Sequence, residues 1–210
     1  MQQQQTVHLF VYDTLADWEP GYAIAGINNP EWQVQPGRYR VRTVGAGTGS
    51  VTTAGGVTIV PDMAAADLQP AESAMLILPG GSVWDSGGVP EAVEKAREFL
   101  AAGVPVAAIC GATAGLARAG LLDGVDHTSN APEYLQATGY GGAARYRAEP
   151  AVSDGGLITA PGTAPLEFAR EIFRTLGLYE PRMLDAWYAL FKTGDASHFY
   201  ALAGDAEQPA

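Results

Sequence analysis

The 210-residue chain contains a single cysteine, Cys110, so it cannot form an internal disulfide. Because disulfides stabilise small domains in oxidising compartments, this sequence gains no stability from secretion. Met1 is followed by four glutamines, without the positive and apolar regions of a signal peptide. No uninterrupted run of about 18 apolar residues is present that could span a membrane. We therefore expect a cytoplasmic protein with no membrane partner.

Basic residues are also scarce: 12 Lys and Arg stand against 23 Asp and Glu, for a formal net charge of −11. Nucleic acids and anionic membrane surfaces bind clustered Lys and Arg, so we expect no nucleic-acid partner. A small neutral or carbonyl-bearing substrate is compatible with this charge. One cysteine and three scattered histidines do not suggest a dedicated zinc site, and we expect no metal and no cofactor.

Apolar segments that alternate with helical ones predict an α/β fold. Apolar residues form 47% of the chain, which is enough for a substantial core. Continuous apolar runs at residues 7–12, 74–78 and 104–109 are typical of strands buried on both faces. Helices are expected at 18–28, where Asp17 is the candidate cap, and at 90–102. Such an alternation gives a mostly parallel sheet sandwiched by helices.

The remaining segments complete one domain, which we expect to span residues 6–202. Its last part, 179–202, reads as a helical extension rich in aromatic residues, which complete a core or form an oligomer interface. The other expected elements are strands at 38–44 and 125–128, hairpins within 50–60 and around 154–156, and helices at 132–138, 167–176 and 184–192.

Cys110 stands where an apolar strand runs directly into a helical stretch that continues to residue 119. The sequence Ala108-Ile109-Cys110-Gly111-Ala112 has the form small-x-nucleophile-x-small, which is typical of a strained nucleophile elbow. The helix N-terminus favours the thiolate, which is the nucleophilic form of the side chain. The alternative is a structural cysteine that packs like a small apolar residue.

Two further loops are expected near Cys110, because ligands bind beyond the carboxyl ends of parallel strands. Pro79-Gly80-Gly81 follows an apolar strand, and its glycines let backbone N–H groups approach a ligand, as an oxyanion hole requires. An ordinary glycine-rich turn is the alternative. The segment 13–19 follows the first strand and is expected to converge on the same pocket.

Taken together, these segments resemble the DJ-1/PfpI superfamily, which has a flavodoxin-like, class I glutamine amidotransferase-like fold. The resemblance extends over about residues 7–178. It implies that an acid of the first helix lies against the cysteine; Glu19 matches that position and Asp17 is its nearest competitor. A carboxyl group shielded beside a thiolate should be protonated and donate to sulfur. The similarity also implies a homodimer. It rests on Leu78-Pro79-Gly80-Gly81, the Cys110 elbow, Ala119-Gly120-Leu121-Leu122-Asp123-Gly124 and Thr128-Ser129.

The chain departs from parts of this family's pattern. Protease- and amidase-like members have a histidine directly after the cysteine, whereas this chain has Gly111, which argues against proteolysis and amidotransfer. Other members carry a histidine after the next strand. Asn130 aligns there, and His127 lies three residues earlier. The sequence leaves open which of the two faces the sulfur, and also whether Trp84 lines the pocket or a dimer contact.

The resemblance implies a stress-related, cysteine-dependent enzyme, a hydrolase or a glyoxalase-type lyase that acts on small reactive carbonyls. Cys110 would attack the carbonyl and Glu19 would handle the proton, with His127 as a third candidate catalytic residue. Backbone N–H groups of Gly80, Gly81 and Gly111 would bind the substrate oxygen. The alternative is a redox-responsive protein whose cysteine is oxidised to sulfenic or sulfinic acid without turnover.

Overall fold

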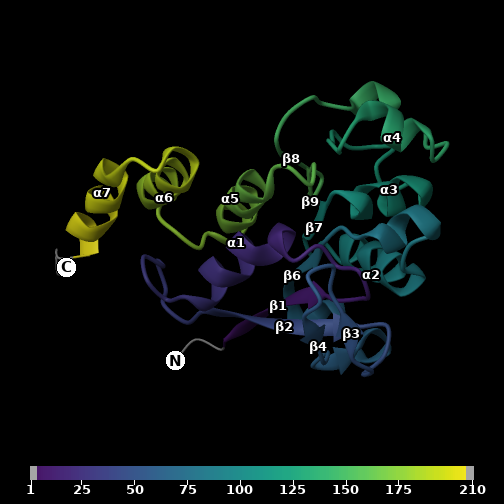
Figure 1. The fold of residues 1–210 in the computed structure, drawn as a ribbon, viewed down its shortest axis with the longest axis horizontal. Helices are drawn as coiled ribbons and strands as arrows, with labels where there is room; N and C mark the ends of the chain where they lie inside the picture. Colours follow the sequence, from purple (N-terminus) through teal and green to yellow (C-terminus); the bar gives the residue numbers. More distant parts are fainter. Residues whose placement is uncertain (1–3, 207–210) are drawn as a thin grey trace.

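The computed structural model describes residues 4–206 and contains a mostly parallel seven-stranded sheet between layers of helices (Figure 1). Neighbouring strands pair in parallel except β8 and β9, which form an antiparallel hairpin. The predicted α/β sandwich is therefore confirmed. In spatial order, the strands are β5 (Met63–Ala64), β2 (Tyr39–Gly45), β1 (Gln5–Phe10), β6 (Ser73–Leu78), β7 (Val106–Ile109), β9 (Leu157–Ala160) and β8 (Val152–Asp154).

The three apolar runs of the sequence form the centre of this sheet, as β1, β6 and β7. Their side chains are almost entirely buried; Val7, Leu76 and Val106 have no exposed surface. A parallel strand with helices on both faces has no solvent side, which is why these runs are continuous rather than alternating. The predicted hairpins are also present, one between β3 (Val51–Thr52) and β4 (Thr58–Ile59) and one between β8 and β9.

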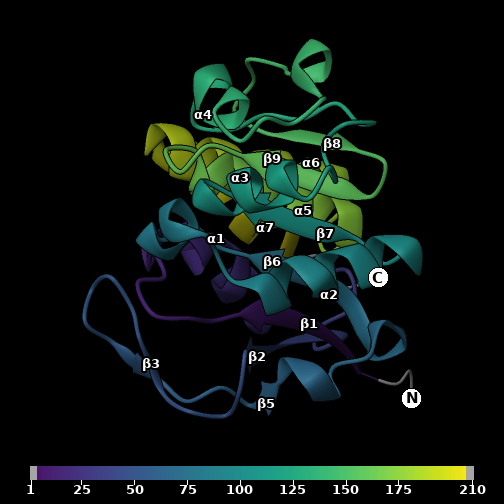
Figure 2. The same cartoon turned by 90° about the vertical axis from the view of Figure 1, so that its right-hand side faces the viewer.

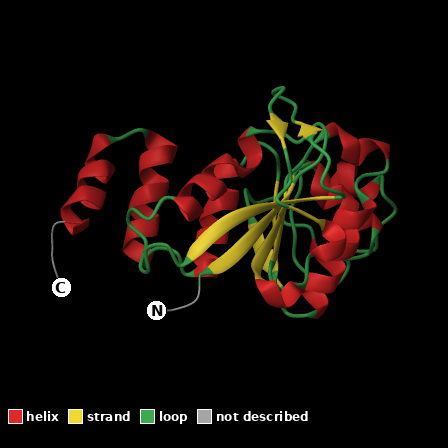
Figure 3. Cartoon of the chain, turned by 90° about the horizontal axis from the view of Figure 1, so that it is seen from below, coloured by secondary structure: helices red, strands yellow, loops and turns green. Residues whose placement is uncertain are grey.

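Helices cover both faces of the sheet (Figure 3). Helices α1 and α5 pack together on one face, and α2 and α3 lie on the other, in front of the strands in Figure 2. Helices α2, α4, α5 and α6 begin with proline, whose fixed φ and missing N–H suit the first turn. The helices are α1 (Trp18–Asn28), α2 (Pro90–Ala101), α3 (Gly111–Arg118), α4 (Pro132–Gln136), α5 (Pro165–Leu176), α6 (Pro181–Thr193) and α7 (Ala196–Ala206).

The C-terminal helices continue away from the sheet, with α6 on α5 and α7 on α6 (Figure 1). Trp187 of α6 is buried and its ring centroid lies 4.9 Å from that of Phe173 in α5, so part of the extension completes the core. Phe199 and Tyr200 of α7 are exposed. Among residues 4–206, no helix is long and apolar enough to cross a membrane.

Two local predictions are wrong. The segment 125–128 forms only an isolated bridge, between His127 and Tyr146, rather than a strand. The N–H groups on either side of His127 donate to side chains: that of Asp126 to Oδ2 of Asp154 over 2.8 Å, and that of Thr128 to Oγ1 of Thr159 over 2.9 Å. Asp17 makes no side-chain cap to α1; its carboxylate accepts from the N–H of Gly55 in the β3–β4 hairpin over 2.6 Å.

The packing of α1 against α5 depends on Gly26, which lies directly under the ring of Phe173. A Cβ atom at Gly26 would overlap the ring carbon Cζ, whereas a Cβ atom at Gly21 of the same helix would meet nothing within 4 Å. The two glycines therefore form a matched pair for testing this interface.

We expect Gly26→Ala to destabilise the protein, because overpacking a core costs about 1–3 kcal/mol. We expect Gly21→Ala to be neutral or to stabilise the fold, because alanine is favoured over glycine inside a helix by up to about 1 kcal/mol. Urea unfolding of both variants measures the difference. Equal effects of the two substitutions would contradict this account of the α1–α5 contact.

Candidate active site

Cys110 stands on a strained turn between β7 and α3, with φ 57° and ψ −124°. A residue with a Cβ atom rarely adopts positive φ, and such strain persists only where surrounding contacts enforce it. Here, the N–H of Cys110 donates to Ala160 O over 2.9 Å, and the hydroxyl of Thr113 donates to Cys110 O over 2.6 Å. The predicted nucleophile elbow is thus confirmed.

The loops that follow the two neighbouring strands, β6 and β9, bring their backbone close to the elbow. A Cβ atom at Gly80, after β6, would lie 2.6 Å from Cβ of Cys110, and one at Gly162, after β9, would lie 2.8 Å from Sγ. No other residue type allows so close an approach of backbone to the thiol. The sequence analysis identified Gly80 and missed Gly162, although Gly162 also follows a parallel strand.

A cleft of about 550 Å³ opens above Cys110 at the carboxyl ends of the strands. The strand order reverses between β1 and β6, and in open α/β sheets ligands bind at such a point. The expected convergence of the segment 13–19, the glycine loop and Cys110 is therefore seen. The cleft is lined by Thr14, Ala16, Trp18, Glu19, Ala54, Gly81, Ser82, Asp85, Cys110, Gly111, Asn130 and Tyr134.

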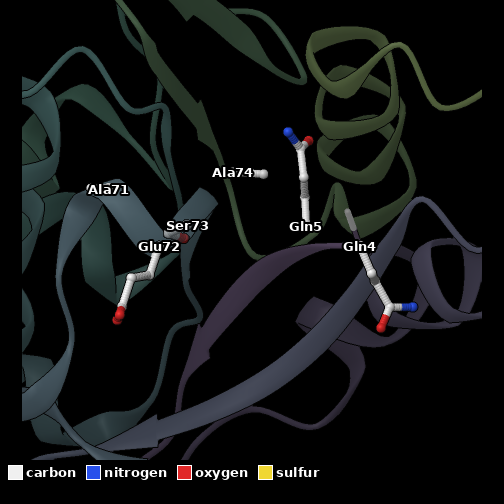
Figure 4. A pocket seen from close by; sticks show the side chains of 6 residues that line it. All are labelled: Gln4, Gln5, Ala71, Glu72, Ser73 and Ala74. Carbon is white, nitrogen blue, oxygen red and sulfur yellow. The ribbon is translucent and has the colours of Figure 1, made fainter. Parts of the chain in front are cut away.

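A smaller cavity of about 230 Å³ lies at the opposite ends of β1 and β6, between residues 4–5 and 71–74 (Figure 4). Glu72 supplies its only charged side chain. Neither a cysteine nor a strained residue lines it. Among residues 4–206, no group of three or more His, Cys, Asp or Glu side chains is placed to hold a metal ion.

Glu19 has no exposed surface and lies beside the sulfur. Its Oε2 accepts a short hydrogen bond from the N–H of Gly80. Its Oε1 has no hydrogen-bond partner among the described residues. Both Oε1 and Sγ of Cys110 lie against the backbone of Gly162. Burial raises the pKa of Glu19 to about 7. A proton on Oε1 would satisfy this atom and donate to the sulfur, so Glu19 rather than Asp17 is the acid of the site.

Burial, and then the Glu19 charge, raise the pKa of the Cys110 thiol to about 11. The amide of Asn130 and the N–H of Gly111 act in the opposite direction. The helix N-terminus favours the thiolate, as expected, through the N–H of Gly111, but burial and the neighbouring carboxylate have the larger effect on the thiol pKa. Protonation of Glu19 removes the charge repulsion, so the states of thiol and carboxyl are linked.

Asn130, not His127, faces the sulfur. Nδ2 of Asn130 donates to Sγ over 3.4 Å, and its Oδ1 accepts from the N–H of Gly162 over 2.8 Å. His127 is fully buried, with Nδ1 2.8 Å from Val125 O and Nε2 3.0 Å from the hydroxyl of Tyr140. Because both ring nitrogens are engaged elsewhere, the prediction that places His127 with the catalytic residues is corrected.

Gly80, which the sequence predicts to bind substrate, and Trp84, whose place the sequence leaves open, lie beneath the cleft rather than in it. The N–H of Gly80 donates to Glu19, so Gly80 has no free donor for a substrate oxygen, whereas Gly81 and Gly111 do line the cleft. Trp84 is fully buried, and its Nε1 donates to the hydroxyl of Tyr12 over 2.8 Å. Trp84 thus supports the glycine loop from below and lines neither the pocket nor an exposed surface.

The DJ-1/PfpI family model matches residues 5–175, nearly the whole of the α/β domain. The chain belongs to the DJ-1/PfpI family. This membership agrees with the elbow and with the acid of the first helix that lies against the cysteine.

Relatives of this DJ-1/PfpI protein match 90–97% of its length. It is 39% identical over 203 residues to a protein named uncharacterized protease YoaZ from Bacillus subtilis, covering 95% of this chain and 97% of the relative. A ThiJ/PfpI family protein from Bacillus anthracis is 40% identical with a TM-score of 0.89, over 97% and 98% of the two chains. The DJ-1 superfamily protein Atu0886 from Agrobacterium tumefaciens is 33% identical with a TM-score of 0.80, over 90% and 97%.

We expect the two polar neighbours of Cys110 to shift its reactivity in opposite directions. Glu19→Gln removes a charge that disfavours the thiolate, so alkylation by iodoacetamide should reach half its maximal rate at a lower pH. Asn130→Ala removes a donor to sulfur, so the midpoint should move to a higher pH. Intact mass reports the single site directly. Midpoints that move together would contradict this electrostatic account.

The raised pKa of Glu19 also predicts a pH-dependent stability. A carboxyl group whose pKa is higher in the folded state favours folding when protonated; this contribution is complete below the ordinary value of 4.5 and is lost as the pH rises to about 7. Between about pH 4 and pH 7, wild type should lose about 3 kcal/mol of unfolding free energy relative to Glu19→Gln. Urea titrations across this range test it, and parallel pH profiles would exclude the shifted pKa.

Proposed function

We propose that this DJ-1/PfpI protein is a cysteine-dependent enzyme that acts on small reactive carbonyls, as a glyoxalase-type lyase or a hydrolase. One observation carries the proposal: a strained thiol at the base of a cleft adjoins a buried carboxyl oxygen that has no other hydrogen-bond partner within residues 4–206. This pair can add sulfur to a carbonyl and move a proton within the same small volume.

In the first step, the sulfur of Cys110 forms a bond to the aldehyde carbon of a 2-oxoaldehyde such as methylglyoxal. The π electrons of the carbonyl move to its oxygen, which takes up the proton released by the thiol, relayed by Glu19. The N–H groups of Gly81 and Gly111 line the cleft and are the candidate donors to that oxygen. The product of this step is a neutral hemithioacetal.

In the second step, Glu19 in its carboxylate form removes the hydrogen of the former aldehyde carbon as a proton and returns it to the adjacent carbon. The hydroxyl proton of the hemithioacetal moves to the oxygen of that adjacent carbon. The result is a 2-hydroxy thioester, and water then cleaves its carbon–sulfur bond to give the 2-hydroxy acid and the free thiol. No external oxidant or reductant is needed. A carboxyl pKa of about 7 suits a group that accepts and donates a proton at neutral pH.

Peptide hydrolysis is less well supported, although two Bacillus subtilis relatives are named uncharacterized proteases. Cleavage of an amide requires a general acid that protonates the leaving nitrogen. The residue after Cys110 is Gly111, and His127 is engaged with Val125 and Tyr140. An aldehyde has no leaving amine, so the Cys110–Glu19 pair is sufficient for its chemistry.

A redox-responsive protein without turnover is the second candidate. Peroxide would transfer one oxygen to the thiolate of Cys110 and leave as water, which gives a sulfenic acid, and a second peroxide would give the sulfinic acid. The chain has no second cysteine to form a disulfide. A protonated Glu19 and the amide of Asn130 are donors that would stabilise the oxidised sulfur.

We expect wild type to consume methylglyoxal and form lactate, and Cys110→Ala to lose this activity. Glu19→Gln should reduce kcat by about 100-fold or more, the usual effect of losing a general acid–base. Asp17→Asn is the matched control, since this neighbouring acid contacts Gly55 rather than the sulfur. A chromatographic assay for lactate measures all four proteins.

Two results would overturn the proposed enzyme. Full activity of Cys110→Ala would show that the thiol is not the nucleophile. Absence of turnover in wild type, combined with rapid addition of one or two oxygen atoms at Cys110 under mild peroxide, would instead favour the redox-responsive protein.

A further inference from the structure

The cleft above Cys110 has an asymmetric set of charged side chains. Glu19 and Asp85 line it, and no lysine, arginine or histidine does so among the residues that the structure describes. Arg118, whose charge acts on Tyr134 at the cleft wall, donates to Trp84 O over 3.0 Å and is not among the residues that line the cleft. A ligand in the cleft therefore meets negative charge and backbone dipoles.

Asp85 is held in place at the cleft without neutralisation. It lies on the single turn Ser82–Ser86, and its Oδ1 accepts from the hydroxyl of Tyr134 over 2.9 Å. This bond fixes the carboxylate but leaves its charge, and no described Lys, Arg or His forms an ion pair with it. An anchored, unpaired carboxylate at a cleft wall favours a cationic ligand.

Trp18 adds a second feature that attracts positive charge. The side chain is 58% exposed at the first turn of α1 and lines the cleft. Its Nε1 donates to Gly162 O over 3.3 Å, which orients the ring. The face of an indole is the best aromatic partner for a cation.

The reacting state contributes negative charge as well. When the thiol and the carboxyl together hold a single proton, either the sulfur of Cys110 or the carboxyl of Glu19 is anionic. Oε1 of Glu19, fully buried and without another hydrogen-bond partner among the described residues, belongs to the same cleft. A carboxylate or phosphate on the incoming molecule would be repelled both by Asp85 at the wall of the cleft and by the Cys110–Glu19 pair at its base.

We propose that this cleft selects carbonyl compounds that carry positive charge over those that carry a carboxylate or phosphate, with Asp85 and Trp18 as the determinants. The statement about substrates rests on the proposed function. The charge preference itself is a property of the surroundings of Cys110, so it can be measured without any turnover.

Two methanethiosulfonate reagents of similar size provide the test, one ending in trimethylammonium and one in sulfonate. In both, the thiolate of Cys110 attacks the sulfenyl sulfur, a disulfide forms and methanesulfinate leaves. The rate is read by intact mass at low ionic strength. We expect the ratio of cationic to anionic rates to exceed that of 2-mercaptoethanol by about ten-fold or more, as a charged cleft steers reagents. Because both rates are proportional to the fraction of Cys110 that is ionised, their ratio does not depend on that fraction.

Matched variants separate the cleft from the net charge of −11. Asp85→Asn should lower the ratio by about three-fold or more. Trp18→Leu should slow the cationic reagent with little effect on the anionic one. Glu72→Gln removes the same charge at the opposite ends of the strands, beside the cavity of Figure 4, and should leave the ratio unchanged.

A wild-type ratio equal to that of 2-mercaptoethanol would overturn the proposal, and so would equal effects of Asp85→Asn and Glu72→Gln. Loss of the proposed function is a separate outcome. A protein that shows the charge preference but does not convert methylglyoxal would refute the carbonyl enzyme and retain the cationic cleft.

Discussion

The contact between a buried carboxyl and a half-buried thiol is the constraint around which this site is built. Neither group can ionise freely, because charge is disfavoured where water is excluded. The N–H of Gly80 satisfies one oxygen of Glu19 and leaves the other to the sulfur of Cys110. Burial brings the pKa of Glu19 to about 7, so proton transfer within the pair becomes accessible near neutral pH.

The fold supplies this contact through its strand order. Because the chain leaves β1 for one face of the sheet and β6 for the other, their loops separate at the carboxyl edge and leave room for a cleft. Glu19 enters from α1, Gly80 from the end of β6 and Cys110 from the end of β7. The strain at Cys110 is held by ordinary backbone hydrogen bonds to β9 and α3, so the rigid core stabilises an unfavourable conformation where chemistry is expected.

Much of this arrangement was accessible from the sequence, because buried parallel strands and a small-x-nucleophile-x-small turn leave local signals. The elbow, the helix that carries Glu19 and the hairpins are of this kind. The rest depends on long-range geometry. Whether His127 or Asn130 faced Cys110 depended on a segment that forms no strand, and its path is fixed by side-chain bonds to Thr159 and Asp154. The engaged N–H of Gly80 and the upward shift of the thiol pKa likewise need the folded surroundings.

The central claim is that Glu19 holds a proton beside the sulfur up to near-neutral pH. A carbon-13 NMR titration of the glutamate side-chain carboxyl carbons, with Glu19 assigned by its absence in Glu19→Gln, observes this group directly. The account predicts a midpoint near the shifted pKa of about 7. A midpoint close to the ordinary value of 4.5 would contradict it, because the carboxyl would then be ionised at neutral pH and would have no proton to donate to the sulfur or to a substrate.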